Sequence, residues 1–156
     1  MNLTIVPFGN AHIVGDKVTC QHGAKECAGN RWEACAIALA PVEQHIEFYF
    51  CFEKAGEKQL QSVQKCVTAA KMNYTDMSTC YHGPQGLALQ KMNAALTPKD
   101  HKYTPWVTLD GKSGADDGFL KKLCAAYKAG GGTEPAGCKK AAPVVRKIAH
   151  DANTLA

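Results

Sequence analysis

The chain has 156 residues, a length typical of one domain that buries roughly two-thirds of the surface exposed by its unfolded form. Hydrophobic residues make up 46% and charged residues 21%, without repeats or low-complexity tracts, which excludes disordered, collagen-like and solenoid proteins. No apolar run approaches the ~20 residues that a membrane span needs. The net charge of +4 is small and the lysines are scattered among acids, so nucleic acid is not expected as a partner.

The first elements are expected to be a strand and a hairpin. Asn2–Val6 alternates and is rich in β-branched residues before a proline interrupts it, which predicts a strand. His12–Val14 and Lys17–Thr19 are separated by two turn-forming residues, a pattern typical of a tight hairpin. This hairpin would deliver Cys20 to the segment that follows.

A helical block is expected over about residues 25–98, because apolar residues recur there three and four positions apart. Val42–Lys54 lacks a clean period, so helix and strand both remain possible, and its length favours a buried helix. The residues expected to face the core are Ala28, Trp32, Cys35 and Leu39, then Phe48, Tyr49, Phe50 and Phe52, then Leu60, Val63, Val67 and Ala70, and, after Pro84, Leu89, Met92 and Leu96.

The pattern changes at Tyr103. Tyr103–Leu109 predicts a strand, and the following Asp-Gly pair predicts its hairpin turn. A helix is expected next, beginning near Asp116 and Asp117 and ending at Gly130, with Leu120, Leu123 and Tyr127 on its apolar face. Residues 139–156 form a tail in which Val145, Ile148, Ala152 and Leu155 suggest an amphipathic helix. This order of elements implies an α/β or α+β fold in which helices cover a small sheet.

Eight cysteines in so short a chain indicate an oxidised, secretory or lysosomal protein, and no two of them have C-x-x-C spacing. Asn2-Leu3-Thr4 and Asn73-Tyr74-Thr75 are acceptor patterns for N-glycosylation and lend weak support to that compartment. Met1 leads directly into the expected strand without a signal segment. We therefore expect a start that is missing from this sequence.

Three cysteines, a histidine and a glutamate lie close together in CQHGAKECAGNRWEAC, which runs from Cys20 to Cys35. A zinc site with His22 as fourth ligand, a reactive thiol and a disulfide framework could each use such a cluster. The intervals are long for zinc, so structural disulfides are favoured and no metal is expected. His22 is expected to be a hydrogen-bonded turn residue rather than a general base, because no reactive cysteine is assigned beside it.

This stretch follows the pattern CQHGxxECxxNxxxxC, which resembles the signature of the gamma-interferon-inducible lysosomal thiol reductases, the GILT family. Two flanking segments, Leu3–Ala11 and Tyr103–Thr108, resemble the family's second strand and its later proline strand. The resemblance extends from about Asn2 to Cys138. The eight signature residues are Cys20, Gln21, His22, Gly23, Glu26, Cys27, Asn30 and Cys35.

The resemblance implies a thioredoxin-like domain over residues 1–138 with a helical insertion, which reduces disulfides of protein substrates in a lysosomal or extracellular compartment. Family members carry a catalytic C-x-x-C before the strand that here begins at Asn2, so no residue of this chain is assigned as catalytic. The absent first strand and helix would leave neighbouring strands without ladder partners. A segment from elsewhere is expected to fill that position: an N-terminal part, a separate chain or a second copy.

The resemblance also implies that the Thr104–Pro105 bond is cis and that its loop faces a protein substrate or a partner strand. Trp106 beside it is expected in the core.

Two local disulfides are expected, Cys66–Cys80 and Cys124–Cys138, because each would close a short loop worth ~3 kcal/mol in the chain-entropy account. Cys20, Cys27, Cys35 and Cys51 would then pair among themselves. No cofactor is expected. Two functions remain open: the scaffold of a GILT-like thiol–disulfide oxidoreductase, inactive as given because its catalytic pair lies elsewhere, or a non-catalytic structural or binding subunit of a larger assembly.

Overall fold

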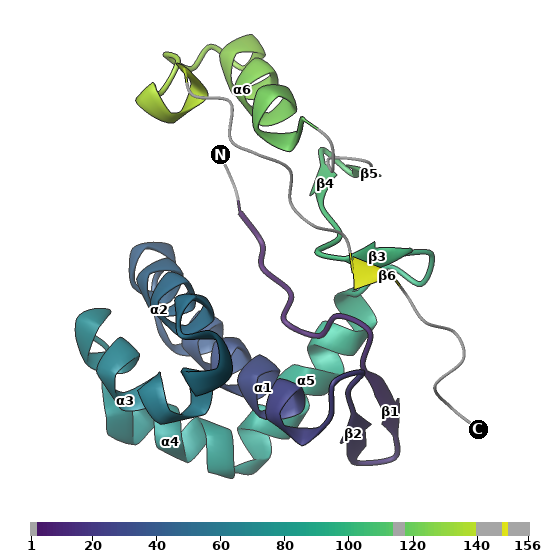
Figure 1. The fold of residues 1–156 in the computed structure, drawn as a ribbon, viewed down its shortest axis with the longest axis vertical. Helices are drawn as coiled ribbons and strands as arrows, with labels where there is room; N and C mark the ends of the chain where they lie inside the picture. Colours follow the sequence, from purple (N-terminus) through teal and green to yellow (C-terminus); the bar gives the residue numbers. More distant parts are fainter. Residues whose placement is uncertain (1–2, 114–117, 140–147, 150–156) are drawn as a thin grey trace. The chain divides into compact units, whose positions relative to one another are not determined.

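The computed structural model describes residues 3–113, 118–139 and 148–149. The chain divides into two compact units, Thr4–Lys99 and a second unit made of residues 1–3 and 100–156. Helices dominate the first unit, and the described residues of the second form short strands and one α-helix (Figure 1). The architecture is therefore α+β, as expected, with small two-stranded sheets. None of the helices in the described ranges is long and apolar enough to cross a membrane.

The first unit contains the helical block that the sequence predicts. Two helices of this block begin at prolines. Pro41 is the N-cap of the second helix, and Pro84 is the first residue of the fifth, where the N–H that proline lacks would have no partner within the helix. The segment whose periodicity is ambiguous is helical. The α-helices are α1 (Ala24–Leu39), α2 (Val42–Lys54), α3 (Gln59–Ala69), α4 (Tyr74–His82) and α5 (Pro84–Leu96), and a 3-10 turn, η1 (Gly56–Lys58), precedes α3.

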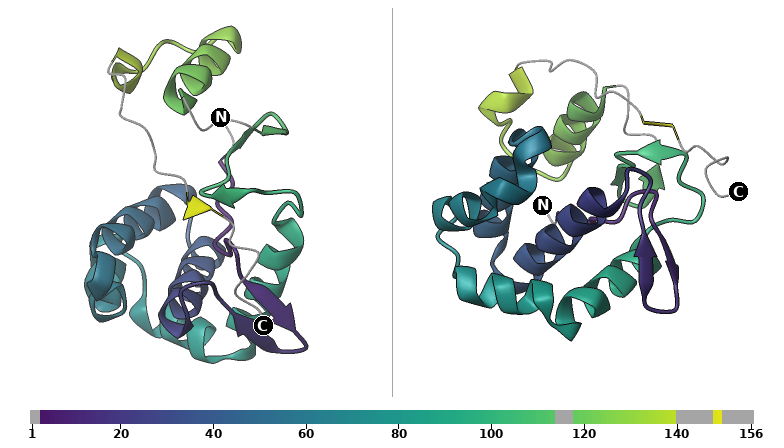
Figure 2. Two further views of the ribbon diagram at one scale, coloured as in Figure 1. Left: turned by 45° about the vertical axis from the view of Figure 1, so that its right-hand side comes forward. Right: turned by 60° about the horizontal axis from the view of Figure 1, so that its bottom comes forward.

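Helix α1 is the centre of this unit and contacts each of α2, α3, α4 and α5. The views in Figure 2 show the other helices arranged around it. Its buried positions explain this placement, because Trp32, Cys35 and Ala36 are all nearly inaccessible. The core they build is completed by Phe48, Phe52, Val63, Cys66, Val67, Ala70, Met77 and Cys80.

Four inward assignments are wrong. Leu39, the last residue of α1, is 40% exposed. Met92 and Leu96 are 51% and 53% exposed, because α5 turns a different stripe, Gly86, Gln90 and Asn93, toward α1 and the N-terminal segment. That stripe has helical spacing too, but its residues are glycine and amides, so hydrophobicity alone selects the wrong face. Phe50 is 67% exposed, on the side of α2 opposite Phe48 and Phe52.

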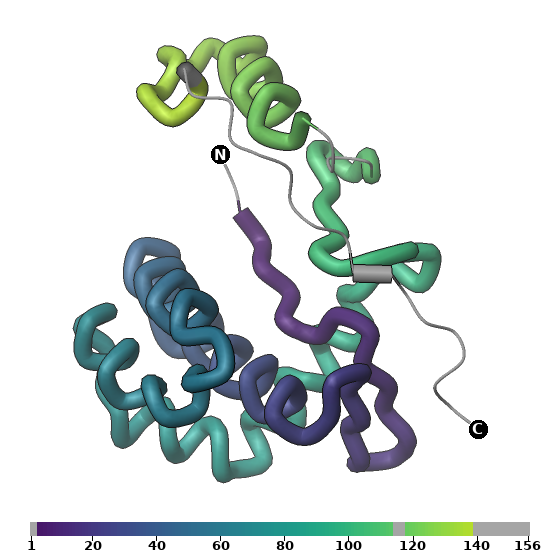
Figure 3. The backbone as a smooth tube through the Cα atoms, viewed as in Figure 1, coloured from purple at the N-terminus to yellow at the C-terminus, as the bar shows by residue number. Residues whose placement is uncertain are grey.

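The hairpin is confirmed: β1 (His12–Val14) pairs antiparallel with β2 (Lys17–Thr19), with Val14 opposite Lys17. A second, smaller core of Phe8, Ala11 and Cys20 lies beneath it. The strand expected at Asn2–Val6 is not formed in the described part, where residues 3–6 have no regular secondary structure and run as an open trace toward the hairpin (Figure 3). A β-branched pattern produces a strand only where a ladder partner is available.

In its described residues, the second unit has two short sheets. β3 (Tyr103–Thr104) pairs antiparallel with β6 (Ile148–Ala149), and β4 (Thr108–Leu109) with β5 (Lys112–Ser113) across the expected Asp-Gly turn. The expected strand 103–109 is thus interrupted in the middle. Two helical elements follow, α6 (Phe119–Ala129), which ends at Gly130 as expected, and the 3-10 helix η2 (Ala136–Lys139).

The prediction of a helix in the tail is wrong for Ile148. This residue lies in a strand, because it pairs with Thr104. The other residues of that expected helix, Val145, Ala152 and Leu155, lie outside the described residues, as do Asp116 and Asp117.

All eight cysteines form disulfides: Cys20–Cys27, Cys35–Cys80, Cys51–Cys66 and Cys124–Cys138. Cys124–Cys138 is confirmed, and Cys20–Cys27 agrees with pairing inside the remaining group. The Cys66–Cys80 pairing is wrong, and so is the confinement of Cys35 and Cys51 to that group. Loop length misleads here because helix packing decides the partners: α1 on α4 brings Cys35 to the distant Cys80, and α2 on α3 brings Cys51 to Cys66, a loop nearly as short as the expected one.

Candidate functional site

The turn between β2 and α1 carries the first half of the signature. Gly23 is the N-cap of α1 and has φ 86°, a conformation that favours glycine over residues with a Cβ. Its N–H donates to the carbonyl of Cys20 at 3.1 Å, and its own carbonyl accepts from the N–H of Cys27 at 3.3 Å. These bonds bring Cys20 and Cys27 together, with Cα atoms 5.5 Å apart, as a disulfide requires.

His22 and Glu26 close the same turn. The backbone N–H of His22 donates to Oε2 of Glu26 at 2.6 Å, and the His22 ring nitrogen Nδ1 lies 3.3 Å from that oxygen. Glu26 stands in the first turn of α1, where a carboxylate also favours the positive end of the helix. His22 is therefore a hydrogen-bonded turn residue, as expected from its setting.

The two amide residues of the signature attach this turn to the N-terminal segment. Gln21 accepts a hydrogen bond from Nδ2 of Asn10 at 2.7 Å. Asn30 donates from Nδ2 to the carbonyl of Phe8 at 3.3 Å. Both bonds satisfy polar groups close to the small core under the hairpin, where an unmade bond would cost about 1–3 kcal/mol.

Cys35, the last signature residue, is fully buried and joins α1 to α4 through Cys80. Together with Cys20–Cys27, this pairing occupies all three cysteines of the cluster. A zinc site there would need thiolates, which these disulfides do not provide. Among the residues that the structure describes, no group of three or more His, Cys, Asp or Glu side chains is placed to hold a metal ion.

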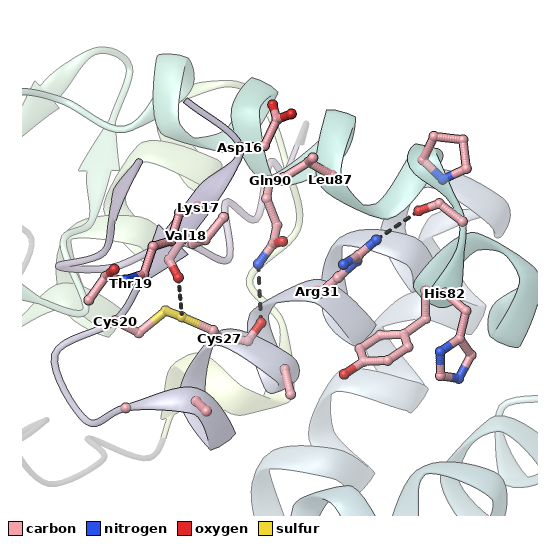
Figure 4. A pocket seen from close by; sticks show the side chains of 16 residues that line it. Asp16, Lys17, Val18, Thr19, Cys20, Cys27, Arg31, His82, Leu87 and Gln90 are labelled. Carbon is pink, nitrogen blue, oxygen red and sulfur yellow. Dashed lines mark hydrogen bonds between the residues drawn. A yellow bond between two sulfur atoms is a disulfide. The ribbon is translucent and has the colours of Figure 1, made fainter. Parts of the chain in front are cut away.

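A groove of about 660 Å³ opens beside the Cys20–Cys27 disulfide (Figure 4). Its walls come from the hairpin, the first turns of α1 and the corner between α4 and α5. Gln90 of α5 crosses its floor and donates from Nε2 to the carbonyl of Cys27 at 3.1 Å. Cys27 Sγ also lies 3.8 Å from the carbonyl oxygen of Val18, a packing contact because a disulfide sulfur carries no proton.

Arg31 forms the wall of the groove near α4. One terminal nitrogen donates to the carbonyl of Gly83 at 2.7 Å, and the guanidinium carbon lies 5.4 Å from the centroid of the Tyr81 ring. Tyr81 stacks in turn on the buried Trp32, with ring centroids 4.2 Å apart. Arg31 thus ties the α4–α5 corner to α1 through a cation–π contact and a charge-assisted hydrogen bond.

One ion pair lies at the outer rim of the groove. Lys91 of α5 forms a salt bridge with Asp16 in the hairpin turn. The hydrogen bond and the positive charge of Lys91 lower the pKa of Asp16. The exposed pair is screened by solvent, so it orients the hairpin on α5 more than it stabilises the fold.

The Thr104–Pro105 bond lies in the second unit and is cis, as expected. Thr104 is paired with Ile148, and Pro105 is exposed. Trp106 is half-buried rather than in a core, and its ring meets the Tyr103 ring edge-on at 5.0 Å.

Comparison with known proteins identifies the family. Residues 1–70 match the profile of the family described as gamma interferon inducible lysosomal thiol reductase (GILT). The gamma-interferon-inducible lysosomal thiol reductase of Carassius auratus is 34% identical over 155 residues, which cover 88% of this chain and 59% of the relative. That of Mus musculus is 32% identical over 161 residues, covering 96% of this chain and 63% of the relative. The chain belongs to the GILT family.

A third GILT-family relative, the gamma-interferon-responsive lysosomal thiol protein of Arabidopsis thaliana, is 33% identical over 150 residues, covering 90% of this chain and 62% of the relative. The chain thus spans between 59% and 63% of the length of these three relatives.

In this GILT-family chain, the eight signature residues all have structural contacts, and none of its cysteines is a free thiol. The sequence analysis did not single out Arg31 and Gln90, which line the groove, or Asn93, which bonds the N-terminal segment. Asn93 donates from Nδ2 to the carbonyl of Pro7 at 3.4 Å. The four- and three-residue spacing of Gly86, Gln90 and Asn93 is the signal that could have revealed them, because a polar stripe at helical spacing needs buried acceptors.

Proposed function

We propose that this chain is the scaffold of a GILT-like thiol–disulfide oxidoreductase that acts on protein disulfides. The observation that carries this proposal is the signature turn, in which Cys20–Cys27, Gly23 and the bonds of Gln21, Glu26 and Asn30 form one connected structure. The named relatives of Carassius auratus and Mus musculus are thiol reductases. The scaffold in this account is thioredoxin-like, and the helical unit is its insertion.

The cis-proline loop is the part of the scaffold that meets the substrate or a partner strand. Pro105 is exposed and follows a cis bond, and Thr104 before it is half-buried. A protein substrate would approach here with its disulfide, attacked by a low-pKa thiolate and released by a second thiol.

The catalytic pair comes, in this proposal, from a segment outside the 156 residues. No two cysteines in the sequence have C-x-x-C spacing, and all eight are consumed in disulfides. The chain as given should therefore not turn over a disulfide substrate. The assay uses a self-quenched, disulfide-bonded peptide at acidic pH with a small thiol as reductant. Turnover clearly above the thiol alone, and lost in Cys20→Ser, would contradict the proposal.

A second candidate function is a non-catalytic GILT-like subunit that binds or supports another protein. The full oxidation of the cysteines favours it, because such a protein needs the stapled scaffold and no reactive thiol. The coding sequence upstream of Met1 separates the two. An in-frame C-x-x-C there supports the enzyme, and reductase activity of the extended chain that is lost on mutating that pair would establish it.

The compartment follows from the same reasoning. Four disulfides require oxidising conditions during folding, and two of the named relatives are lysosomal thiol reductases. We place this chain in the secretory pathway, with the lysosome or the extracellular space as its destination. Localisation of the tagged full-length protein in its own cells distinguishes these two destinations.

A further inference from the structure

The turn between α3 and α4 carries a feature that the proposed function does not use, the acceptor triplet Asn73-Tyr74-Thr75. Asn73 is the N-cap of α4, and all three residues of the triplet are exposed. The other triplet of the chain begins at Asn2, outside the described residues.

The two ends of the Asn73 amide are used differently. Oδ1 accepts hydrogen bonds from the backbone N–H of Thr75 at 2.8 Å and of Asp76 at 3.3 Å, which satisfies donors that the first turn of a helix leaves unpaired. Both bonds end on the oxygen. The amide nitrogen Nδ2 belongs to an exposed side chain and takes no part in the cap.

We propose that Asn73 is an N-glycosylation site at which the sugar is carried on Nδ2 while Oδ1 continues to cap α4. The donor is an oligosaccharide linked to a lipid pyrophosphate. Nδ2 attacks C1 of its first sugar, the C1–N bond forms, the C1–O bond to the lipid pyrophosphate breaks, and Nδ2 loses one proton. The substituted amide keeps its carbonyl oxygen, so both hydrogen bonds of the cap survive the modification.

The position also keeps the glycan away from the groove. His82 lines the groove at the far end of α4, eight residues from Tyr74, which at a rise of 1.5 Å per residue is roughly 12 Å along the helix axis. The attachment point on Asn73 therefore lies at the opposite end of α4 from the residue that lines the groove. The glycan and the proposed reductase scaffold are compatible on one chain.

The experiment secretes the full chain from eukaryotic cells behind a cleavable leader, with Asn2→Gln in every variant to remove the other triplet. Protein is recovered from medium and lysate together, so retained chains are counted. Asn73→Asp keeps a capping oxygen but has no amide nitrogen, Thr75→Val removes the triplet, and Thr75→Ser preserves it. Because the leader supplies the compartment, the result does not depend on whether the chain supports disulfide reduction.

The parent chain and Thr75→Ser should be heavier than their sequence mass, and peptide N-glycosidase in ¹⁸O-water should remove the excess and convert Asn73 to labelled aspartate. Asn73→Asp and Thr75→Val should show neither change. An unmodified Asn73 peptide from folded parent chain would overturn the site. The thermal midpoint of the glycosylated chain should match that of Asn73→Asp, and a fall to the lower midpoint of Asn73→Ala would overturn the shared use of the amide.

Discussion

Glu33 is a carboxyl group buried in α1, 5% exposed, with Oε1 lacking a hydrogen-bond partner. Burial, followed by the negative charge of Glu53 and a hydrogen bond to it, holds the pKa of Glu33 well above its ordinary value of 4.5. Tyr49 faces the same carboxyls, and burial with their charges raises its pKa also. Glu53 is anchored in turn by Gln59, which donates to it at 2.6 Å.

Glu33→Gln should therefore make stability less dependent on pH. A raised pKa means that the folded chain binds the proton more tightly than the unfolded chain, so this contribution is complete below pH 4.5 and is lost as pH rises toward the folded value. Each unit of elevation corresponds to about 1.4 kcal/mol. Chemical unfolding at several pH values should show that the free energy of unfolding falls more between pH 4.5 and neutrality for the original chain than for the variant. Glu57→Gln, at an exposed position, is the control, and parallel curves for Glu33→Gln and the original chain would contradict the account.

Gly86 of α5 lies close to Arg31 of α1 and to the backbone of α4. A Cβ there would lie 2.3 Å from Nε of Arg31 and 2.7 Å from the backbone oxygen of Cys80. Arg31 can move, but the carbonyl of α4 cannot move without shifting the helix. Gly86→Ala should lower the free energy of unfolding by roughly 1–3 kcal/mol, as overpacking does. The matched control is Gly137→Ala, whose Cβ would meet nothing within 4 Å, and equal midpoints for the two variants would show that the contact is not limiting.

At the scale of elements, the longest covalent loop is the one that fixes α4 on α1. Cys35–Cys80 closes 45 residues of chain, whereas Cys124–Cys138 closes 14 and joins α6 to the short helix after it. In the chain-entropy account a 45-residue loop contributes about 4 kcal/mol and a 14-residue loop about 3 kcal/mol.

Cys35→Ala with Cys80→Ala should thus reduce the stability of the helical unit by at least about 4 kcal/mol, since two buried sulfurs are lost as well. Hydrogen exchange localises the effect: protection should fall in α1 and α4. Cys124→Ala with Cys138→Ala should change exchange in α6 and leave those two helices as they were. Loss of protection in α1 from both double variants would argue against this division.

At the scale of the whole molecule, every disulfide lies inside one unit. Three are within Thr4–Lys99 and one is within the second unit, so no covalent bridge joins the two besides the peptide chain. Lys99 and Lys102 are exposed at the junction.

Limited tryptic cleavage at this junction should therefore release two fragments that separate on a denaturing gel without reductant. Mass spectrometry should find six cysteines in the first fragment and two in the second. Fragments that stay linked until reductant is added would mean that a cysteine of the helical unit pairs with Cys124 or Cys138, contrary to the structure.

The sequence predicted the elements whose causes are local. The β1–β2 hairpin, the Asp-Gly turn after Leu109 and the end of α6 at Gly130 depend on a few neighbouring residues, and all three are formed. The turn role of His22 and the cis bond before Pro105 were also predicted, the second through the family resemblance.

The sequence did not predict the structural features that depend on residues far away along the chain. The residues 3–6 lack the ladder that would make them a strand, and Ile148 pairs with Thr104 instead of extending a helix. The buried face of α5 is chosen by acceptors at Cys27 and Pro7, more than sixty positions away, which no periodicity records. The partner of Cys35, 45 residues away, was missed for the same reason. That of Cys51 was missed because its loop to Cys66, 15 residues, is nearly as short as the expected Cys66–Cys80 loop, so loop length does not distinguish them.

Two of the three disulfides of the helical unit are nested, with Cys51–Cys66 inside the loop of Cys35–Cys80. A chain synthesised from its N-terminus can close them in order without threading. One interval is vulnerable: after Cys51 has emerged and before Cys66 has, Cys35 and Cys51 are two thiols without their partners. Their separation of 16 residues, 51 minus 35, hardly differs from the 15 of the native Cys51–Cys66 loop, so chain entropy does not tell right from wrong. Oxidative folding must rely there on α1 having already turned Cys35 away from α2, or on an isomerase that reopens the mispaired bridge.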